Sequence, residues 1–182
     1  MQQFTSSFNL VLSALTVIAQ VISVGLIVSL FSRKLDATRF VRFFKERGVL
    51  VALVASVIAT AGSLTYSDII GYAPCTFCWF QRIFMYPQVL IMGIALIIKD
   101  SAAKTYGAAL SVIGATIALF HYLGQLGVTE LPCSAVGVSV SCAHRAVFQF
   151  GYITIPLMAF SAFLLIALTL VLSMRKDNEA SS

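Results

Sequence analysis

The sequence has very few charged residues for its length. Only 10% of its 182 residues are Asp, Glu, Lys or Arg, whereas soluble domains carry about 25%. Hydrophobic residues make up 59%, and the mean hydropathy is +0.96. A soluble protein of this composition would have almost no polar surface to cover its core. The shortage of charge argues against an ordinary soluble domain and favours a membrane protein.

The apolar residues fall into five long runs with few interruptions. Each has about 18–22 residues, enough for a helix to cross a hydrocarbon core of ~30 Å. The runs are Leu10–Phe31, Val49–Tyr66, Trp79–Ile98, Gly107–Leu126 and Tyr152–Ser173. Lys and Arg are absent before the first run, whereas a cleaved signal peptide has a positive segment there and a shorter apolar stretch. We therefore predict an all-α membrane protein with five transmembrane helices, the first of them retained.

Basic residues lie on alternate connectors between these runs. The residues are Arg33, Lys34, Arg39, Arg42, Lys45, Arg47, Lys99, Lys104, Arg175 and Lys176. Because positive connectors stay in the cytoplasm, we expect an N-terminus outside and a C-terminus in the cytoplasm. The net charge of +5 is thus an orientation signal, and no soluble module is present that would bind nucleic acid.

Two patterns predict local packing. In the first basic connector, Phe40, Phe43 and Phe44 have helical spacing, which suits either an interfacial amphipathic helix or an ordinary basic loop. Small residues recur every four positions in the fourth run, where they would let helices approach closely in lipid. They are Gly107, Ser111 and Ala115, with Gly114 and Ala118 beside them. Pro87 and Pro156 predict kinks in the third and fifth helices.

The four cysteines form two local pairs on the predicted outer side. Cys75 and Cys78 begin the third run, and Cys133 and Cys142 lie in the next external segment. The second pair suits a simple loop staple. A Cys-x-x-Cys bridge closes too short a loop to stabilise a fold much, and a helix N-terminus stabilises a thiolate, so the first pair favours redox chemistry. We expect no metal site, because the two pairs lack the spacing of zinc knuckles.

Arg82 lies four residues after Cys78, on the same helical face and one turn deeper. A charge at this depth costs about 2.5–3.5 kcal/mol on insertion scales and needs an acceptor. A lipid phosphate, a helix-end carbonyl or a bound ligand would serve, and snorkelling to the head groups remains open. The functional alternative is that Arg82 and the Cys78 thiolate face a quinone dissolved in the bilayer.

These motifs resemble the DsbB family of disulfide-generating membrane oxidoreductases. The segments "CTFCWFQRIFMYP", "LPCSAVGVSVSC" and "FGYITIP" look closest to its BdbC-like branch. The resemblance covers about residues 49–173. It implies a bacterial cytoplasmic (inner) membrane protein that reoxidises an extracytoplasmic, thioredoxin-like, DsbA-like thiol oxidase and reduces ubiquinone or menaquinone.

The resemblance also implies a role for each site residue. Cys133 would accept attack from the partner, Cys142 would exchange with Cys75, and Cys78 would meet the quinone. Arg82 would hold or polarise that quinone. His121 would lie beside it, although a hydrogen-bonded core histidine is an equal alternative.

The resemblance divides the chain into three parts. We expect an extra N-terminal helix and its basic connector at 1–48, a DsbB-like four-helix domain at 49–176, and a short, disordered cytoplasmic tail at 177–182. Two rival functions are a vitamin K epoxide reductase-like enzyme and a non-enzymatic membrane protein stapled by disulfides. In the former group the loop cysteines precede the Cys-x-x-Cys, whereas here Cys133 and Cys142 follow it.

Overall fold

The computed structural model describes residues 2–31, 38–129, 142–143 and 145–181. Within these ranges the chain forms five long helices, each long and apolar enough to cross a membrane. They are α1 (Gln2–Phe31), α3 (Arg39–Leu64), α4 (Thr76–Ile98), α5 (Ala102–Gln125) and α6 (Ile155–Ser181). A π-helical turn, η1 (Thr65–Ile69), extends α3. The predicted all-α, five-helix membrane fold is confirmed.

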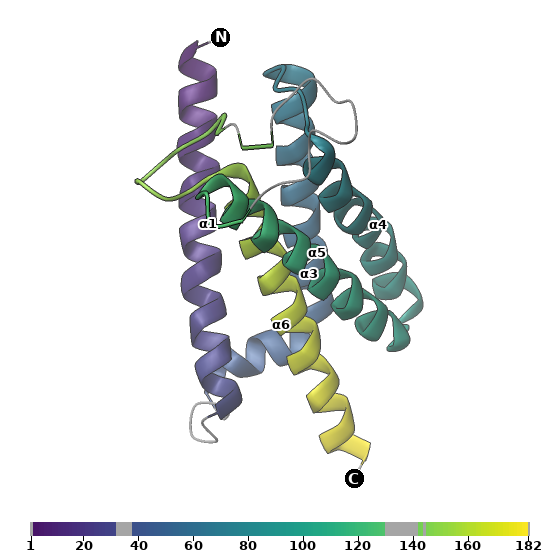
Figure 1. Ribbon diagram of the computed structural model, residues 1–182. Helices are drawn as coiled ribbons and strands as arrows, with labels where there is room; N and C mark the ends of the chain where they lie inside the picture. The colour runs from purple at the N-terminus through teal and green to yellow at the C-terminus, as the bar shows by residue number, and fades with distance from the viewer. Residues whose placement is uncertain (1, 32–37, 130–141, 144, 182) are drawn as a thin grey trace.

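Helices α3 to α6 form a four-helix bundle, and α1 stands beside it (Figure 1). α6 is central, because it packs against α5, α3 and α1. Half of its apolar window is buried, against 22% for α1. α1 touches mainly α6 and meets α3 at few places. The extra first helix is therefore an addition to one side of the bundle.

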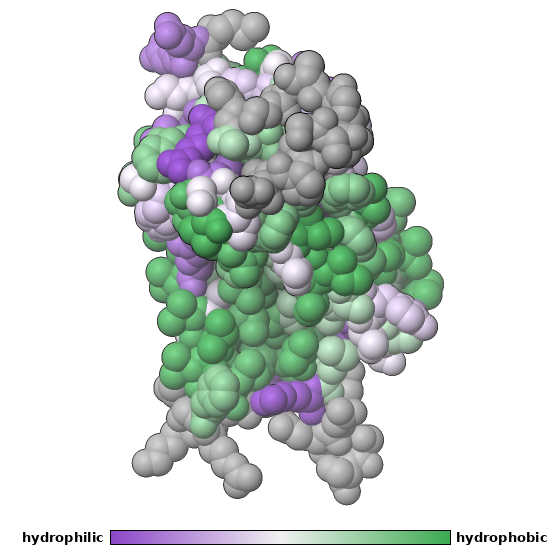
Figure 2. Space-filling model, viewed as in Figure 1, coloured by the Kyte–Doolittle hydropathy of each residue, from purple (hydrophilic) through white to green (hydrophobic). Residues whose placement is uncertain are grey.

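The surface is apolar where a bilayer would surround it. Figure 2 shows a broad green band on one face, with hydrophilic residues at the end near the N-terminus and a purple patch beyond the band at the other end. Large aliphatic side chains such as Val21, Leu90 and Ile97 are exposed. Lipid would cover these side chains, so the chain is a multi-pass membrane protein.

Small residues bring α5 close to its neighbours. Gly107, Ser111, Gly114 and Ala118 are all buried. A Cβ at Gly114 would come within 2.4 Å of the Phe163 ring on α6. The sequence pattern in the fourth run thus marks a close helix contact, as small residues do in membranes.

The basic connector after α1 contains a helix rather than a loop. Residues 39–46 are the first part of α3, separated from the rest by non-helical backbone at Arg47. This part lies across the ends of the neighbouring helices (Figure 1). Phe44 is buried, whereas Phe40 and Phe43 are exposed beside the basic residues. This amphipathic face is the one that an interfacial helix presents.

Two expectations about α6 are wrong. The helix begins at Ile155, so Pro156 lies in the first turn, where a missing N–H breaks no hydrogen bond and no kink is needed. The helix also continues to Ser181, so residues 177–181 are helical rather than disordered. Ser182 lies outside the described residues.

The crossing of α3 and α6 depends on Gly48. A Cβ there would lie 2.7 Å from both the Thr169 carbonyl oxygen and the Ser173 Cβ. We expect Gly48→Ala to push the helices apart and destabilise the protein by about 1–3 kcal/mol. Thermal unfolding in detergent measures this loss. The matched control is Gly93→Ala, whose new Cβ meets only Leu53 Cδ1 at 4.0 Å; equal unfolding temperatures for the two variants would contradict the prediction.

Candidate active site

Cys75 and Cys78 lie at the N-terminus of α4. Cys75 is the N-cap residue with extended backbone, and Cys78 lies in the first turn. Both are free thiols, and their sulfurs are 3.3 Å apart. Cys75 is only 5% exposed. Two thiols this close can form a disulfide with little movement of the chain.

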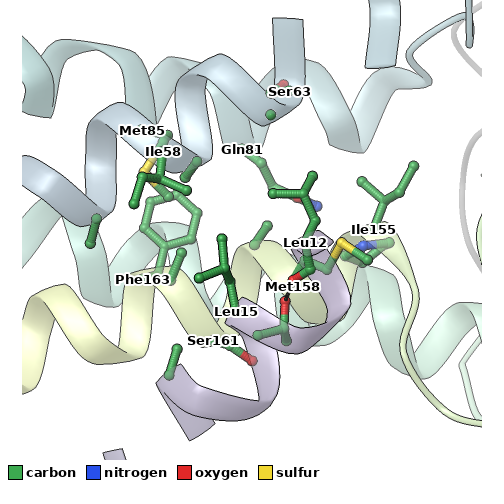
Figure 3. A pocket seen from close by; sticks show the side chains of 18 of the residues that line it. Leu12, Leu15, Ile58, Ser63, Gln81, Met85, Ile155, Met158, Ser161 and Phe163 are labelled. Atoms are coloured by element: carbon green, nitrogen blue, oxygen red, sulfur yellow. Dashed lines mark hydrogen bonds between the residues drawn. The ribbon is translucent and has the colours of Figure 1, made fainter. Parts of the chain in front are cut away.

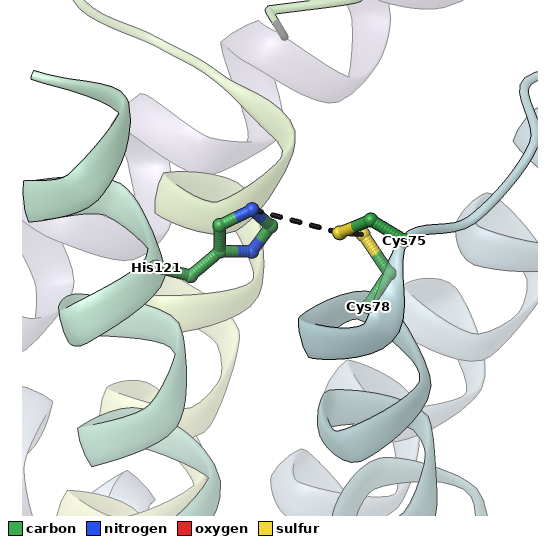
Figure 4. Close-up of side chains that lie close together, drawn as sticks. All are labelled: Cys75, Cys78 and His121. Atoms are coloured by element: carbon green, nitrogen blue, oxygen red, sulfur yellow. Dashed lines mark hydrogen bonds between the residues drawn. The ribbon is translucent and has the colours of Figure 1, made fainter. Parts of the chain in front are cut away.

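His121 of α5 contacts both cysteine segments. Figure 4 shows its imidazole beside Cys75 and Cys78. Its Nε2 lies 3.7 Å from Cys75 Sγ and 3.0 Å from the Cys142 carbonyl oxygen. Its Nδ1 lies 3.0 Å from Nε2 of Gln81. Because a carbonyl only accepts hydrogen bonds, His121 Nε2 carries the hydrogen, and Nδ1 accepts from the Gln81 amide. The arrangement fixes the tautomer, and the one N–H, on Nε2, is shared between the Cys142 carbonyl and the more distant Cys75 sulfur.

The Cys75 thiol is activated by its surroundings. Its pKa is lowered, chiefly because the Cys78 thiol donates a hydrogen bond to the ionised sulfur. Burial opposes this effect, and the hydrogen bond from His121 adds to it. A lowered pKa means that more of Cys75 is thiolate at neutral pH, and the thiolate is the nucleophile in thiol exchange.

Cys142 lies next to this network. It is disulfide-bonded and 2% exposed, and His121 binds its backbone carbonyl. Shortly after it, the Arg145 guanidinium donates to the carbonyl of Gln125 at the end of α5. The structure thus brings Cys142 beside Cys75, whereas Cys133 lies outside the described residues.

Arg82 binds the end of α3. Its Nε donates to Ser63 Oγ at 3.0 Å, and its Nη2 donates to the Ser63 carbonyl at 3.1 Å. The guanidinium carbon lies 5.0 Å from the Trp79 ring centroid, and Tyr86 OH also binds Ser63 Oγ. The acceptor is therefore a helix-end carbonyl, one of the three kinds expected from the sequence. Two of the five N–H groups of Arg82 are used in this way.

A cavity of about 600 Å³ extends from the cysteines between α1, α3 and α6. Figure 3 shows part of its lining. Its thiol, amide, guanidinium and imidazole groups lie at one end, at Cys75, Cys78, Gln81, Arg82 and His121. The remaining walls are largely aliphatic and come from α1, α3 and α6. Such a site fits a ligand with a compact polar head and an apolar body.

The same groups are also potential metal ligands. Donor atoms of Cys75, Cys78 and His121 all lie within 4.8 Å of one another. Three ligands of this kind are the protein set of some catalytic zinc sites. Sequence reasoning had compared only the two cysteine pairs, and so it missed this combination with a histidine from another helix.

Sequence reasoning also missed Gln81 and Ser63. Gln81 is 6% exposed in the middle of an apolar run, and a buried amide needs a partner; this was a usable signal. Ser63 carried no comparable signal, because small polar residues are common in membrane helices.

Comparison with known proteins gives the family. Residues 45–173 match the family model described as "Disulfide bond formation protein DsbB". The chain belongs to the DsbB family. The resemblance inferred from the sequence is confirmed, and the chain is accordingly a membrane oxidoreductase of the disulfide-forming kind. The matched residues include the four-helix bundle, whereas α1 lies outside them.

Curated relatives agree with this DsbB family assignment. "Probable disulfide formation protein C 1" of Bacillus anthracis is 42% identical over 123 residues, which are 68% of this chain and 88% of the relative. "Disulfide bond formation protein C" of Bacillus subtilis is 41% identical over 129 residues, 69% of this chain and 91% of the relative. "Probable disulfide formation protein" of Metapseudomonas resinovorans is 35% identical over 131 residues, which are 70% of this chain and 90% of the relative. No solved structure matches the chain.

The lowered pKa of Cys75 predicts a pH profile. We expect the rate of Cys75 alkylation by iodoacetamide, measured by peptide mass spectrometry over a range of pH, to reach its plateau at a pH below the ordinary thiol pKa of ~8.5. Cys78→Ala should move the midpoint upward more than His121→Leu, because the Cys78 hydrogen bond is the larger cause. A midpoint that neither substitution raises would contradict the network described here.

Proposed function

We propose that this protein reoxidises an extracytoplasmic, thioredoxin-like, DsbA-like thiol oxidase and passes the electrons through two cysteine pairs to a membrane quinone. One observation carries the proposal: Cys75, Cys78, Arg82 and His121 line the polar end of the same apolar cavity. A lipid-soluble oxidant entering that cavity would meet the free dithiol directly. The family membership supports the disulfide chemistry.

The electrons would move inward in three exchanges. The partner's dithiol reduces the Cys133–Cys142 disulfide and leaves as a disulfide. The resulting thiols reduce a Cys75–Cys78 disulfide by thiolate attack through a mixed disulfide. The Cys75–Cys78 dithiol then closes its own S–S bond and releases two electrons and two protons. Before this last step, Cys75 and Cys78 would be free thiols, whose sulfurs lie 3.3 Å apart, and Cys142 would be disulfide-bonded.

The last step needs an acceptor near Cys78. A quinone supplies a two-electron, two-proton oxidant that dissolves in lipid. Cys78 would face it, and the lowered pKa of Cys75 suits that thiolate to attack the Cys78 sulfur as the electrons leave. We expect the N–H groups of Arg82 that do not bind Ser63 to donate to a quinone carbonyl oxygen. His121 would hold its hydrogen toward the Cys75 sulfur.

The orientation follows the charge pattern. We infer that the protein lies in the bacterial cytoplasmic membrane, with its N-terminus and all four cysteines on the outer side. The basic residues of α3, such as Arg39 and Arg42, would then lie in the cytoplasm. A thiol oxidase outside the membrane could reach the segment around Cys142, and a compartment of this kind permits disulfides.

We expect Cys75→Ser and Cys78→Ser each to abolish turnover. The assay uses protein in liposomes with a reduced thioredoxin-like partner and follows the absorbance of the quinone. The matched control is Thr76→Ser, a change between the two cysteines that leaves both sulfurs in place; it should retain activity. If both serine variants of the cysteines still oxidise the partner, the proposed relay is wrong.

The same assay separates thiol chemistry from a resident metal. Treating the wild-type protein with a chelator should leave turnover unchanged if Cys75, Cys78 and His121 act as described. Loss of activity on chelation, with recovery on adding zinc, would instead assign these residues as metal ligands.

A separate test concerns Arg82. We expect Arg82→Met to raise the KM for quinone by roughly ten- to a hundred-fold, the loss of one hydrogen bond from a charged donor. Arg82→Lys should give an intermediate value, because lysine keeps the charge but not the planar fork. Unfolding temperatures of both variants serve as the control for folding. An unchanged KM in a folded Arg82→Met protein would remove Arg82 from the binding site.

A further inference from the structure

We propose that α1 is the side wall of a channel for the apolar tail of the quinone, a role that the four-helix bundle alone does not supply. The inference rests on the proposed function and extends it to a helix outside the residues matched by the family model.

The wall on the α1 side is largely apolar, with Thr16 as its one polar residue among those described. Leu12, Leu15, Ala19 and Ile22 line the cavity at helical spacing. Figure 3 shows Leu12 and Leu15 facing the same space as Ile58 of α3 and Phe163 of α6. α1 therefore faces α3 across the cavity.

The cavity is too long for a quinone ring alone. On α3 its lining extends from Ser63, beside Arg82, to Leu50. Thirteen residues of helix span about 20 Å, which is more than half of the ~30 Å hydrocarbon core. The charged and thiol groups lie at one end, and farther along the cavity the hydroxyls of Thr16 and Ser161 donate to carbonyls of their own helices. The remainder of the cavity therefore suits a linear hydrocarbon chain attached to the head.

Polar contacts hold α1 against the bundle without filling this space. Near the N-terminal end, Tyr66 OH donates to Asn9 Oδ1 at 3.0 Å. In the middle, Gln20 Nε2 donates to Ser161 Oγ at 3.1 Å, and Gln20 Oε1 accepts from Tyr152 OH at 3.1 Å. Hydrogen bonds between helices contribute to association in lipid, where apolar contact alone gives no hydrophobic driving force.

Two further contacts set the spacing between α1 and α3. At the outer side Leu12 lies over Gly62, where a Cβ would come within 3.2 Å of Leu12 Cδ1. At the cytoplasmic side Leu26 is fully buried in a cluster that includes Phe44 and Leu165. α1 is thus fixed at both ends of the cavity, and a tail between these contacts would lie against α1 as well as against the bundle.

The test compares two quinones with the same ring, one with several isoprenoid units and one without a tail. The variant is Leu15→Trp, which places a large ring in the channel. We expect the ratio of kcat/KM for the tailed quinone to that for the tailless one to fall at least tenfold. The control is Val21→Trp on the lipid-facing side of α1, where Val21 is 67% exposed; its ratio should equal that of the wild type.

If this ratio in Leu15→Trp equals that of the wild type, the proposed channel is wrong. The same result is expected if a phospholipid acyl chain, and not the quinone tail, fills the cavity. A second measurement does not depend on turnover or on any substitution. A quinone with a photoreactive diazirine at the end of its tail should label the wild-type protein on α1 between Leu12 and Ile22. Labelling confined to other helices would also overturn the inference.

The two proposals fail in different ways. If the wild-type protein reduces neither quinone, the proposed function is wrong, and the photolabelling still decides whether an isoprenoid chain lies along α1. If the wild-type protein reduces both quinones and the kcat/KM ratio is the same in all variants, the proposed function stands, but the proposed role of α1 as a channel wall is wrong.

Discussion

The hydrocarbon core offers no water to a polar side chain, and this constraint governs the site. Arg82 and His121 would be costly to bury unpaired, so each is bound by a residue of another segment: Arg82 by Ser63 of α3, and His121 by Gln81 of α4. These contacts hold the start of α4 between two neighbouring helices. The position of Cys75 and Cys78 follows from them, because both sulfurs lie within the first turn of that helix.

This network also explains why the two cysteines are not equivalent. Cys75 lies within hydrogen-bond distance of both Cys78 and His121, and His121 also binds the Cys142 carbonyl, whereas Cys78 lies on the helix face that carries Arg82. In the proposed relay, Cys75 would exchange with another sulfur, and Cys78 would pass electrons to a ligand in the cavity. Such a division of roles suits a protein of a disulfide-forming family, in which electrons must enter and leave by different routes.

The sequence predicted the architecture well and the contacts less well. Length and hydropathy located all five helices, although α1 begins at Gln2 instead of Leu10 because Gln, Thr and Ser continue the helix beyond the apolar run. The spacing of Cys78 and Arg82 was also readable, since it lies within one helix. The pairing of Gln81 with His121 was not, because it joins residues 40 positions apart and depends on how α4 and α5 pack. The segment around Cys133 lies outside the described residues.

The absence of a side chain at Gly114 has an effect two helical turns away. Gly114 and His121 share one face of α5, and Phe163 already occupies the space that a methyl group at position 114 would need. Any larger residue there would lift α5 from α6 and carry the imidazole with it. The hydrogen bond from His121 to the Cys75 sulfur, one of the smaller causes of the lowered pKa of Cys75, therefore depends on how closely two backbones can approach in the interior.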